Sequence, residues 1–279
     1  MQQITLTGIA PLVLSGKLPL ITAKINGESK QFLLDNGAPA LVLNSKYDES
    51  DGTPVQAFTA SGEPQNIKTA FIALFEWENI RLENQFALIM DLSHFEKDTG
   101  APIHGIMGCS VMANYELLIN YRDKKIGLLD LPENPPDLID LIAPALIGQP
   151  KTLPIQMAHH FPLVLMRIDG KTLNMAVNMG SCVNTISKVF FKDLQSLGLL
   201  INETPSVIRG MGTRKDVAAY LLKSSIVGIS DEFVIDDMLF AFDDIEIPGA
   251  AVDGTIGYEF FMRVAAIIRF NRREILLGI

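Results

Sequence analysis

The sequence predicts an all-β protein built from two similar lobes with a few short helices. Short apolar segments recur along the 279 residues and are separated by Gly, Asn, Asp and Pro, which is typical of strands joined by turns. Two stretches of the first half also recur, in the same order, in the second half. A chain of this length can hold two domains that each bury a core.

The repeat consists of two ungapped blocks. The first pairs residues 18–38 with residues 161–181, and the second pairs residues 105–126 with residues 254–275. The offset between the copies changes from one block to the next by a few residues, which a surface loop absorbs. Two blocks in the same order indicate two copies of one folding unit. The chain is therefore predicted to divide into an N-terminal lobe (1–130), a linker (131–152) and a C-terminal lobe (153–279).

Turn signals locate the elements of the first half. Asn26-Gly27 separates two apolar segments, which predicts a hairpin, and Gly62 lies at the tip of a second hairpin. Residues 108–115 are predicted to form a short helix, and the proline-rich linker one helical turn at 138–142. Further strands are predicted at residues 40–43, 57–60, 68–77, 85–90, 117–121 and 126–129, and loops at 48–53 and 98–102.

The second half repeats this order. Residues 187–197 are predicted to be helical, with Ser187 as the N-cap. A glycine-rich tip at residues 210–212 takes the place of the first hairpin tip. It lacks the third glycine of a dinucleotide-binding fingerprint, and no βαβ pattern follows, so that site is excluded. The other elements are strands within 218–242, a helix at 257–263, and strands at 266–270 and 274–277.

Composition and charge exclude several classes of function. Hydrophobic residues make up 48% of the chain and charged residues 20%, as in globular proteins. A net charge of −9 argues against binding a nucleic-acid backbone. No apolar run is long enough for a membrane span. The first residues do not resemble a signal peptide, so we expect the protein to stay inside the cell, or to be periplasmic or secreted if a leader was removed.

Cysteine and histidine give no sign of a disulfide framework or a metal site. Cys109 and Cys182 are expected to be small buried residues. The four histidines lack the spacing of metal ligands, and His159 and His160 are predicted to face opposite sides of a strand. We therefore expect neither a metal nor a cofactor.

The most informative stretch is residues 32–43, in which an apolar run, Asp35 at a glycine turn and a second apolar run follow one another. Such a strand–turn–strand unit projects one carboxylate from buried backbone. Alone, the stretch also fits an ordinary hairpin loop, since Asp, Asn and Gly are common turn residues. Its recurrence at residues 176–181 favours a functional turn.

This arrangement resembles the aspartic peptidases of the retropepsin and pepsin type. Those proteins place an Asp-Thr/Ser-Gly turn after an apolar strand, then a glycine-tipped flap hairpin, and then an apolar segment that threads behind the turn. Residues 33–38 resemble the turn, and residues 103–108 and 252–257 resemble the threading segments. The resemblance covers nearly the whole chain. The two-lobed arrangement that it implies is similar to that of bacterial members of the family. It implies an acid-protease β-barrel in each lobe.

The resemblance also implies a pair of catalytic carboxylates, of which this sequence keeps one. Two carboxylates about 3 Å apart share one proton, so that one activates a water and the other donates to the substrate carbonyl. Asp35 occupies the first catalytic position, but the second is Asn178, whose amide neither holds a transferable proton nor acts as a base. Without a partner carboxylate, Asp35 is expected to be ionised at neutral pH.

The second turn position differs from the family as well. The family uses Thr or Ser there, whose hydroxyl bonds across to the other lobe. Asn36 can make a similar bond, whereas Met179 cannot. The residues expected to bind substrate are those of the two turns and the two flap tips: Asn36, Gly37, Gly62, Met179, Gly180, Gly210, Met211 and Gly212.

Three functions remain open. The first is an impaired aspartic-peptidase homologue whose cleft between the lobes binds an extended peptide by strand addition. The second is an active aspartic endopeptidase that uses Asp35, through a dimer that brings two Asp35 turns together or through deamidation of Asn36. The third is a non-catalytic structural module. The expected partner is a peptide or protein.

Overall fold

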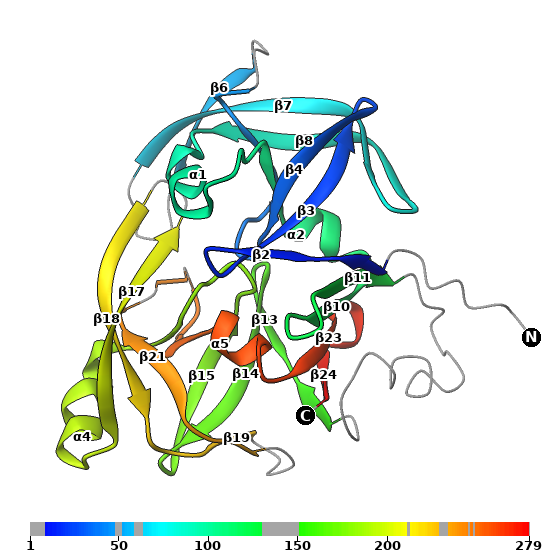
Figure 1. Ribbon diagram of the computed structural model, residues 1–279. Helices are drawn as coiled ribbons and strands as arrows, with labels where there is room; N and C mark the ends of the chain where they lie inside the picture. Colours follow the sequence, from blue (N-terminus) through cyan, green and yellow to red (C-terminus); the bar gives the residue numbers. More distant parts are fainter. Residues whose placement is uncertain are drawn as a thin grey trace, which may run out of the picture.

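The structure is a computed structural model dominated by strands, with a few short helices, which confirms the predicted all-β class (Figure 1). It describes residues 9–47, 52–58, 64–129, 151–210, 213–228, 234–244, 246–247 and 249–278.

The first half of the chain forms an eight-stranded sheet. Its hairpin at Asn26-Gly27 is present as predicted, with both residues at positive φ, as a tight two-residue turn requires. In spatial order the strands are β2 (Val13–Ser15), β3 (Leu18–Ile25), β4 (Glu28–Leu34), β9 (Gly105–Met107), β5 (Leu41–Asn44), β8 (Ile80–Met90), β7 (Pro64–Trp77) and β6 (Thr53–Phe58).

The second half forms a ten-stranded sheet with the same central pattern. β13 (Gln156–Ala158) pairs with β14 beside the main path. In spatial order the path is β17 (Leu200–Gly210), β18 (Thr213–Leu222), β21 (Met238–Phe242), β16 (Asn184–Ile186), β22 (Gly254–Ile256), β15 (Lys171–Val177), β14 (Phe161–Ile168), β19 (Ile226–Gly228) and β20 (Val234–Ile235).

A six-stranded sheet joins the two halves. Its centre is the antiparallel pairing of β10 from the first half with β23 from the second. One buried apolar cluster accordingly contains side chains of both halves, among them Leu34, Tyr121 and Val177. In spatial order the strands are β1 (Ile9–Pro11), β11 (Lys125–Leu129), β10 (Glu116–Asn120), β23 (Ala265–Arg269), β24 (Glu274–Gly278) and β12 (Lys151–Pro154).

The threading segments lie where the resemblance places them. β9 runs parallel to β4 and antiparallel to β5, so that it passes between the two strands that flank the Asp35 turn. β22 lies between β15 and β16 in the same way. Leu34, Ile106 and Ile256 on these strands are buried, because both faces of the strands are covered at this point. β16 and β22 also bury polar side chains, those of Asn184, Thr185 and Thr255.

The short helices agree with the sequence, except that no helix was predicted at Ser93–Thr99 or at Phe270–Arg272. Ser187 caps its helix as predicted, because its Oγ accepts a hydrogen bond from the Val189 amide. The prediction of a loop at 98–102 is wrong at its start, since α1 extends to Thr99. The helical segments are α1 (Ser93–Thr99), α2 (Cys109–Met112), η1 (Lys188–Phe190), α4 (Phe191–Ser196), α5 (Tyr258–Phe261) and η2 (Phe270–Arg272).

Some predictions fall outside the described residues. These are the helical turn at 138–142, most of the loop at 48–53 and most of the linker, of which only Lys151 and Thr152 are described, both in β12. The three-part division of the chain stays a prediction. Among the described residues, no helix is long and apolar enough to cross a membrane.

Candidate active site

The two turns have the same local hydrogen bonds. Asp35 directly follows β4, and Asn178 directly follows β15. The amide of each residue donates to its threading strand, at Met107 O for Asp35 and at Ile256 O for Asn178. The side-chain Oδ1 of each then accepts from the glycine amide two residues on, at 2.8 Å in the first turn and 2.9 Å in the second. Asn178 therefore occupies the same local geometry as Asp35.

The two turns lie directly against each other. A Cβ on Gly37 would lie 2.8 Å from both Asn178 Nδ2 and Asp35 Oδ1, and one on Gly180 would lie 2.3 Å from the Asp35 carboxyl carbon. A side chain at Gly37 would displace both Asn178 and Asp35, and one at Gly180 would displace Asp35. The structure thus brings together four of the predicted site residues.

Asn36 links the two lobes as the sequence analysis expected. Its Nδ2 donates to Val177 O at 2.7 Å, and its Oδ1 accepts from the Met179 amide at 2.8 Å. The side chain is fully buried. Met179 returns no such bond, because its buried thioether packs into the apolar core. One half of the reciprocal link between the turns is therefore kept.

Two residues that the sequence analysis did not select also contact the turns. The Tyr121 hydroxyl donates to Met179 O at 2.7 Å, and His160 Nε2 lies 2.9 Å from Gly37 O. Tyr121 aligns with Phe270 in the internal repeat, so the extra hydroxyl in one copy was a signal that could have identified it.

The prediction that His159 and His160 lie on a strand is wrong. They form the turn between β13 and β14, with His159 at a φ of 55°, and this turn directs the His160 ring to the first lobe. No local pattern in the sequence indicates that contact. Cys109 and Cys182 are both buried, as expected, and burial raises the pKa of the Cys109 thiol to about 11.

Asp35 is partly exposed, yet its surroundings oppose its charge. Burial raises the pKa of Asp35 to about 6, and the hydrogen bond from the Gly37 amide lowers it only in part. Asp35 is therefore mostly ionised at neutral pH, as predicted. The cause of the raised pKa is desolvation and not a second carboxylate.

The flap residues are only partly described. The hairpins that carry them are present, since β6 pairs with β7 and β17 pairs with β18. Gly210 ends β17 and pairs with Thr213, whereas Gly62, Met211 and Gly212 lie outside the described residues.

Chemically, the site offers one carboxylate beside one amide. The carboxylate can accept a proton from a water, and the amide nitrogen can donate a hydrogen bond to a carbonyl. The site shows no second acid in the position opposite Asp35, because Asn178 stands there.

Comparisons with known proteins agree with this arrangement. Residues 21–111 match a family model described as aspartyl protease. A search of curated proteins finds no match. Among solved structures, the crystal structure of basic 7S globulin from soybean is similar, with a TM-score of 0.58 and 9% sequence identity, over 99% of this chain and 95% of that chain. At this identity the likeness shows the fold, which is of the pepsin-like aspartic protease type. The family match lies in the first half of the chain, and the likeness in fold extends over both halves, so the chain is similar to aspartic proteases in part of its sequence and in its fold.

Proposed function

We propose that this chain is a catalytically impaired aspartic-peptidase-like protein that binds an extended peptide in a cleft between its lobes. The observation that carries the proposal is the place of Asn178, which faces Asp35 where the mechanism requires a second carboxylate.

The impairment follows from the two proton transfers that peptide hydrolysis requires. Peptide hydrolysis by this type of site needs a base to activate water and, at the same time, an acid to protonate the substrate. With a pKa of about 6, Asp35 is a base above that pH and an acid below it. Asn178 supplies neither function at any accessible pH. The site therefore lacks one of the two groups at every pH.

Two observations argue against the active alternatives. In a dimer that paired two Asp35 turns, the second turn would have to displace Asn178 and Gly180, which already pack against Asp35. Deamidation of Asn36 would remove an amide whose nitrogen and oxygen are both buried and hydrogen-bonded to the other lobe. Dimerisation through Asp35 and deamidation of Asn36 would each break contacts that hold the two turns together.

Peptide binding is supported by the edges of the two large sheets. β6 ends the eight-stranded sheet and β17 ends the ten-stranded sheet. An edge strand presents unpaired backbone groups to which an extended peptide can add. Both edge strands belong to the hairpins that correspond to the flaps of the family. The retained turns and hairpins favour binding over the third alternative, a purely structural module.

The proposal is tested by cleavage of a mixed peptide library between pH 3 and pH 7. We expect no cleavage by the wild type and none by Asp35→Asn, but cleavage in the acidic range by Asn178→Asp, whose carboxylate would take the hydrogen bond from the Gly180 amide. Wild-type cleavage that disappears in Asp35→Asn would overturn the proposed impairment.

A double variant, Asn178→Asp with Met179→Thr, adds the missing reciprocal link. By analogy with the bonds that Asn36 makes to the second turn, we expect a hydroxyl at position 179 to bond to the first turn, although the smaller side chain leaves a cavity in the core. The exchanged pair Asp35→Asn with Asn178→Asp is the matched control, since it keeps the side-chain composition and again provides one carboxylate. We expect this control to be inactive.

Peptide binding is measured separately by hydrogen exchange on the wild type with library peptides. We expect slower exchange of the amides in β6 or β17 when a peptide adds to either edge. Binding with no change at either edge would contradict strand addition, and no binding at all would favour the structural alternative.

A further inference from the structure

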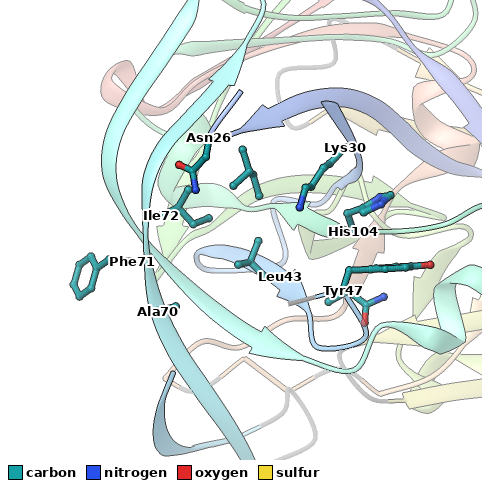
Figure 2. A pocket seen from close by; sticks show the side chains of 10 residues that line it. Asn26, Lys30, Leu43, Tyr47, Ala70, Phe71, Ile72 and His104 are labelled. Carbon is teal, nitrogen blue, oxygen red and sulfur yellow. The ribbon is translucent and has the colours of Figure 1, made fainter. Parts of the chain in front are cut away.

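A second candidate binding site lies in the first half of the chain, in a cavity of about 220 Å³ (Figure 2). Its walls come from the β3–β4 hairpin, the end of β5, the middle of β7 and the residue before β9. None of its lining residues belongs to the Asp35 or Asn178 turn. The cavity is therefore separate from the candidate active site.

One side of the cavity is cationic and rich in donors. Figure 2 shows the Lys30 ammonium and the His104 ring on the same side. His104 Nδ1 accepts from the Gln31 amide, so the ring proton of the neutral form is on Nε2. Burial lowers the pKa of His104 and the charge of Lys30 lowers it further, whereas the charge of Glu96 and the hydrogen bond with the Gln31 amide raise it only in part. The ring stacks on Tyr47 with centroids 4.6 Å apart, which fixes its orientation.

The amide oxygens of the two asparagines in the cavity wall already accept hydrogen bonds from the backbone. Asn26 Oδ1 accepts from the Leu74 amide, and Asn44 Oδ1 accepts from two backbone amides. The Asn26 amide nitrogen, the His104 Nε2–H and the Lys30 ammonium are donors that line the same space. A molecule that fits this arrangement must bring acceptors, and the ammonium favours a negative charge.

The side of the cavity away from Lys30 and His104 is mostly apolar, with Asn26 beside Ile72 as its polar group (Figure 2). Ile25, Leu43, Ala70 and Ile72 provide aliphatic surface within reach of the donors. A cavity of about 150 Å³ in another protein holds a benzene molecule, so 220 Å³ has room for a ring together with a small polar group. A ligand with an acceptor group at one end and an apolar group at the other would place the acceptors against the donors and the apolar group against the aliphatic surface.

We propose that this cavity binds a small monocarboxylate that carries an apolar group, either a free acid or the C-terminal carboxylate of a peptide. A single ammonium balances one negative charge, whereas a phosphate dianion would keep an uncompensated charge in a partly apolar site. The ion pair between Lys30 and Glu28 does not block this role, because it is 3.4 Å long and the Glu28 side chain is 77% exposed.

The test uses phenylacetate as the probe and calorimetry on the whole protein as the measurement. We expect phenylacetate to bind about tenfold or more tightly than the neutral phenylacetamide, and inorganic phosphate not to compete. Lys30→Gln is expected to weaken phenylacetate binding by a similar factor. Lys24→Gln is the matched control, since it removes the same charge from an exposed position on β3 and should leave binding unchanged.

A second variant tests the apolar half of the site. Ala70→Leu fills the cavity while leaving every charge in place, so it should abolish binding of phenylacetate. Equal binding of acid and amide, competition by phosphate, or unchanged binding in both Lys30→Gln and Ala70→Leu would overturn the proposal. Because the site is separate from Asp35, Asp35→Asn should bind phenylacetate as the wild type does, whatever the result for peptide cleavage.

The source of the carboxylate is resolved with two short peptides that end in Phe, one with a free C-terminus and one amidated. Binding of the free-acid peptide alone assigns the site to peptide C-termini. Binding of phenylacetate but of neither peptide assigns it to free acids. Equal binding of both peptides would contradict recognition of the carboxylate.

Discussion

At the residue scale, the pKa of Asp35 makes the stability of the protein depend on pH. The carboxyl has a pKa of 3.8 when fully solvated and about 6 in the folded protein, because burial disfavours its charge. The folded state thus binds more protons than the unfolded state between these values. Its stability falls as the pH rises from about 4 to about 6, and the full cost of the buried charge is present above pH 6.

Replacement of Asp35 by Asn should therefore stabilise the protein at pH 7, by at most about 3 kcal/mol and by less to the extent that solvent reaches the group. Asn178 shows that an amide keeps the hydrogen bond from the glycine of such a turn. Below about pH 4 the gain should vanish, since the Asp35 carboxyl is then mostly protonated in both the folded and the unfolded state. Urea unfolding at pH 4 and pH 7 measures the difference.

The control for this prediction is Asp169→Asn, at an exposed hairpin position with φ of 50° that Asn also tolerates. It should change stability little at either pH. A destabilised Asp35→Asn variant at pH 7 would show that the charge contributes a favourable interaction in the folded state.

At the element scale, the sequence predicted what depends on local or repeated patterns. The hairpin at Asn26-Gly27, the cap at Ser187 and both threading segments follow from turn chemistry, capping and the internal repeat. The candidate turns were identified in the same way. Asn36 was recognised because it is a polar residue at the turn position where the family has Thr or Ser. Contacts between distant segments left no such signal, which is why His160 was missed.

The helix α1 was missed for a related reason. Leu92 at its N-terminus provides no side-chain cap. The Ser93-x-x-Glu96 pattern, which resembles a capping box, lies one residue inside the helix and does not mark its start. The helix is stabilised instead by tertiary contacts. Phe95 is buried, and the Glu96 carboxylate accepts hydrogen bonds from Lys46 Nζ at 2.6 Å and from the Tyr47 hydroxyl at 2.6 Å.

Glu96→Gln should consequently destabilise the protein by about 1–3 kcal/mol at pH 7, because hydrogen bonds to a charged group are lost. Burial raises the pKa of Glu96, but the hydrogen bonds from Lys46 and Tyr47 outweigh it and lower the pKa overall. The stabilisation is present above the unfolded pKa of 4.5 and is lost as the pH falls through the folded value. Unfolding curves at pH 7 and pH 3 should show a smaller difference at pH 3.

Glu83→Gln serves as the comparison for this variant. Its side chain is 66% exposed and its ion pair with Arg81 is 3.6 Å long, so its loss should cost less than about 0.5 kcal/mol. Equal effects of the two substitutions would show that Glu96 stabilises α1 no more than an ordinary surface charge does.

At the scale of the whole molecule, the two halves are joined by continuous structure and not only by a chain connection. The pairing of β10 with β23 carries backbone hydrogen bonds from one half to the other. Arg269 on β23 lies 2.9 Å from Glu116 on β10 and is 5% exposed, so an ion pair reinforces that pairing. Both halves also contribute to one buried core. We therefore expect them to unfold in a single cooperative transition, which different spectroscopic probes would report at the same midpoint.

The contact that most directly fixes the two turns against each other is Asn36, and its removal should weaken the whole molecule. Asn36→Ala leaves the buried Val177 carbonyl and Met179 amide without their partner, which should cost about 2–4 kcal/mol in urea unfolding. Asn36→Thr should recover part of this loss, because a hydroxyl both donates and accepts. Asn114→Ala, at an exposed position, should change stability little.

If Asn36→Thr were as unstable as Asn36→Ala, the loss would reflect the packing of the amide and not its hydrogen bonds. A transition that splits in two for Asn36→Ala alone would mean that this one side chain couples the lobes more strongly than the six-stranded sheet does.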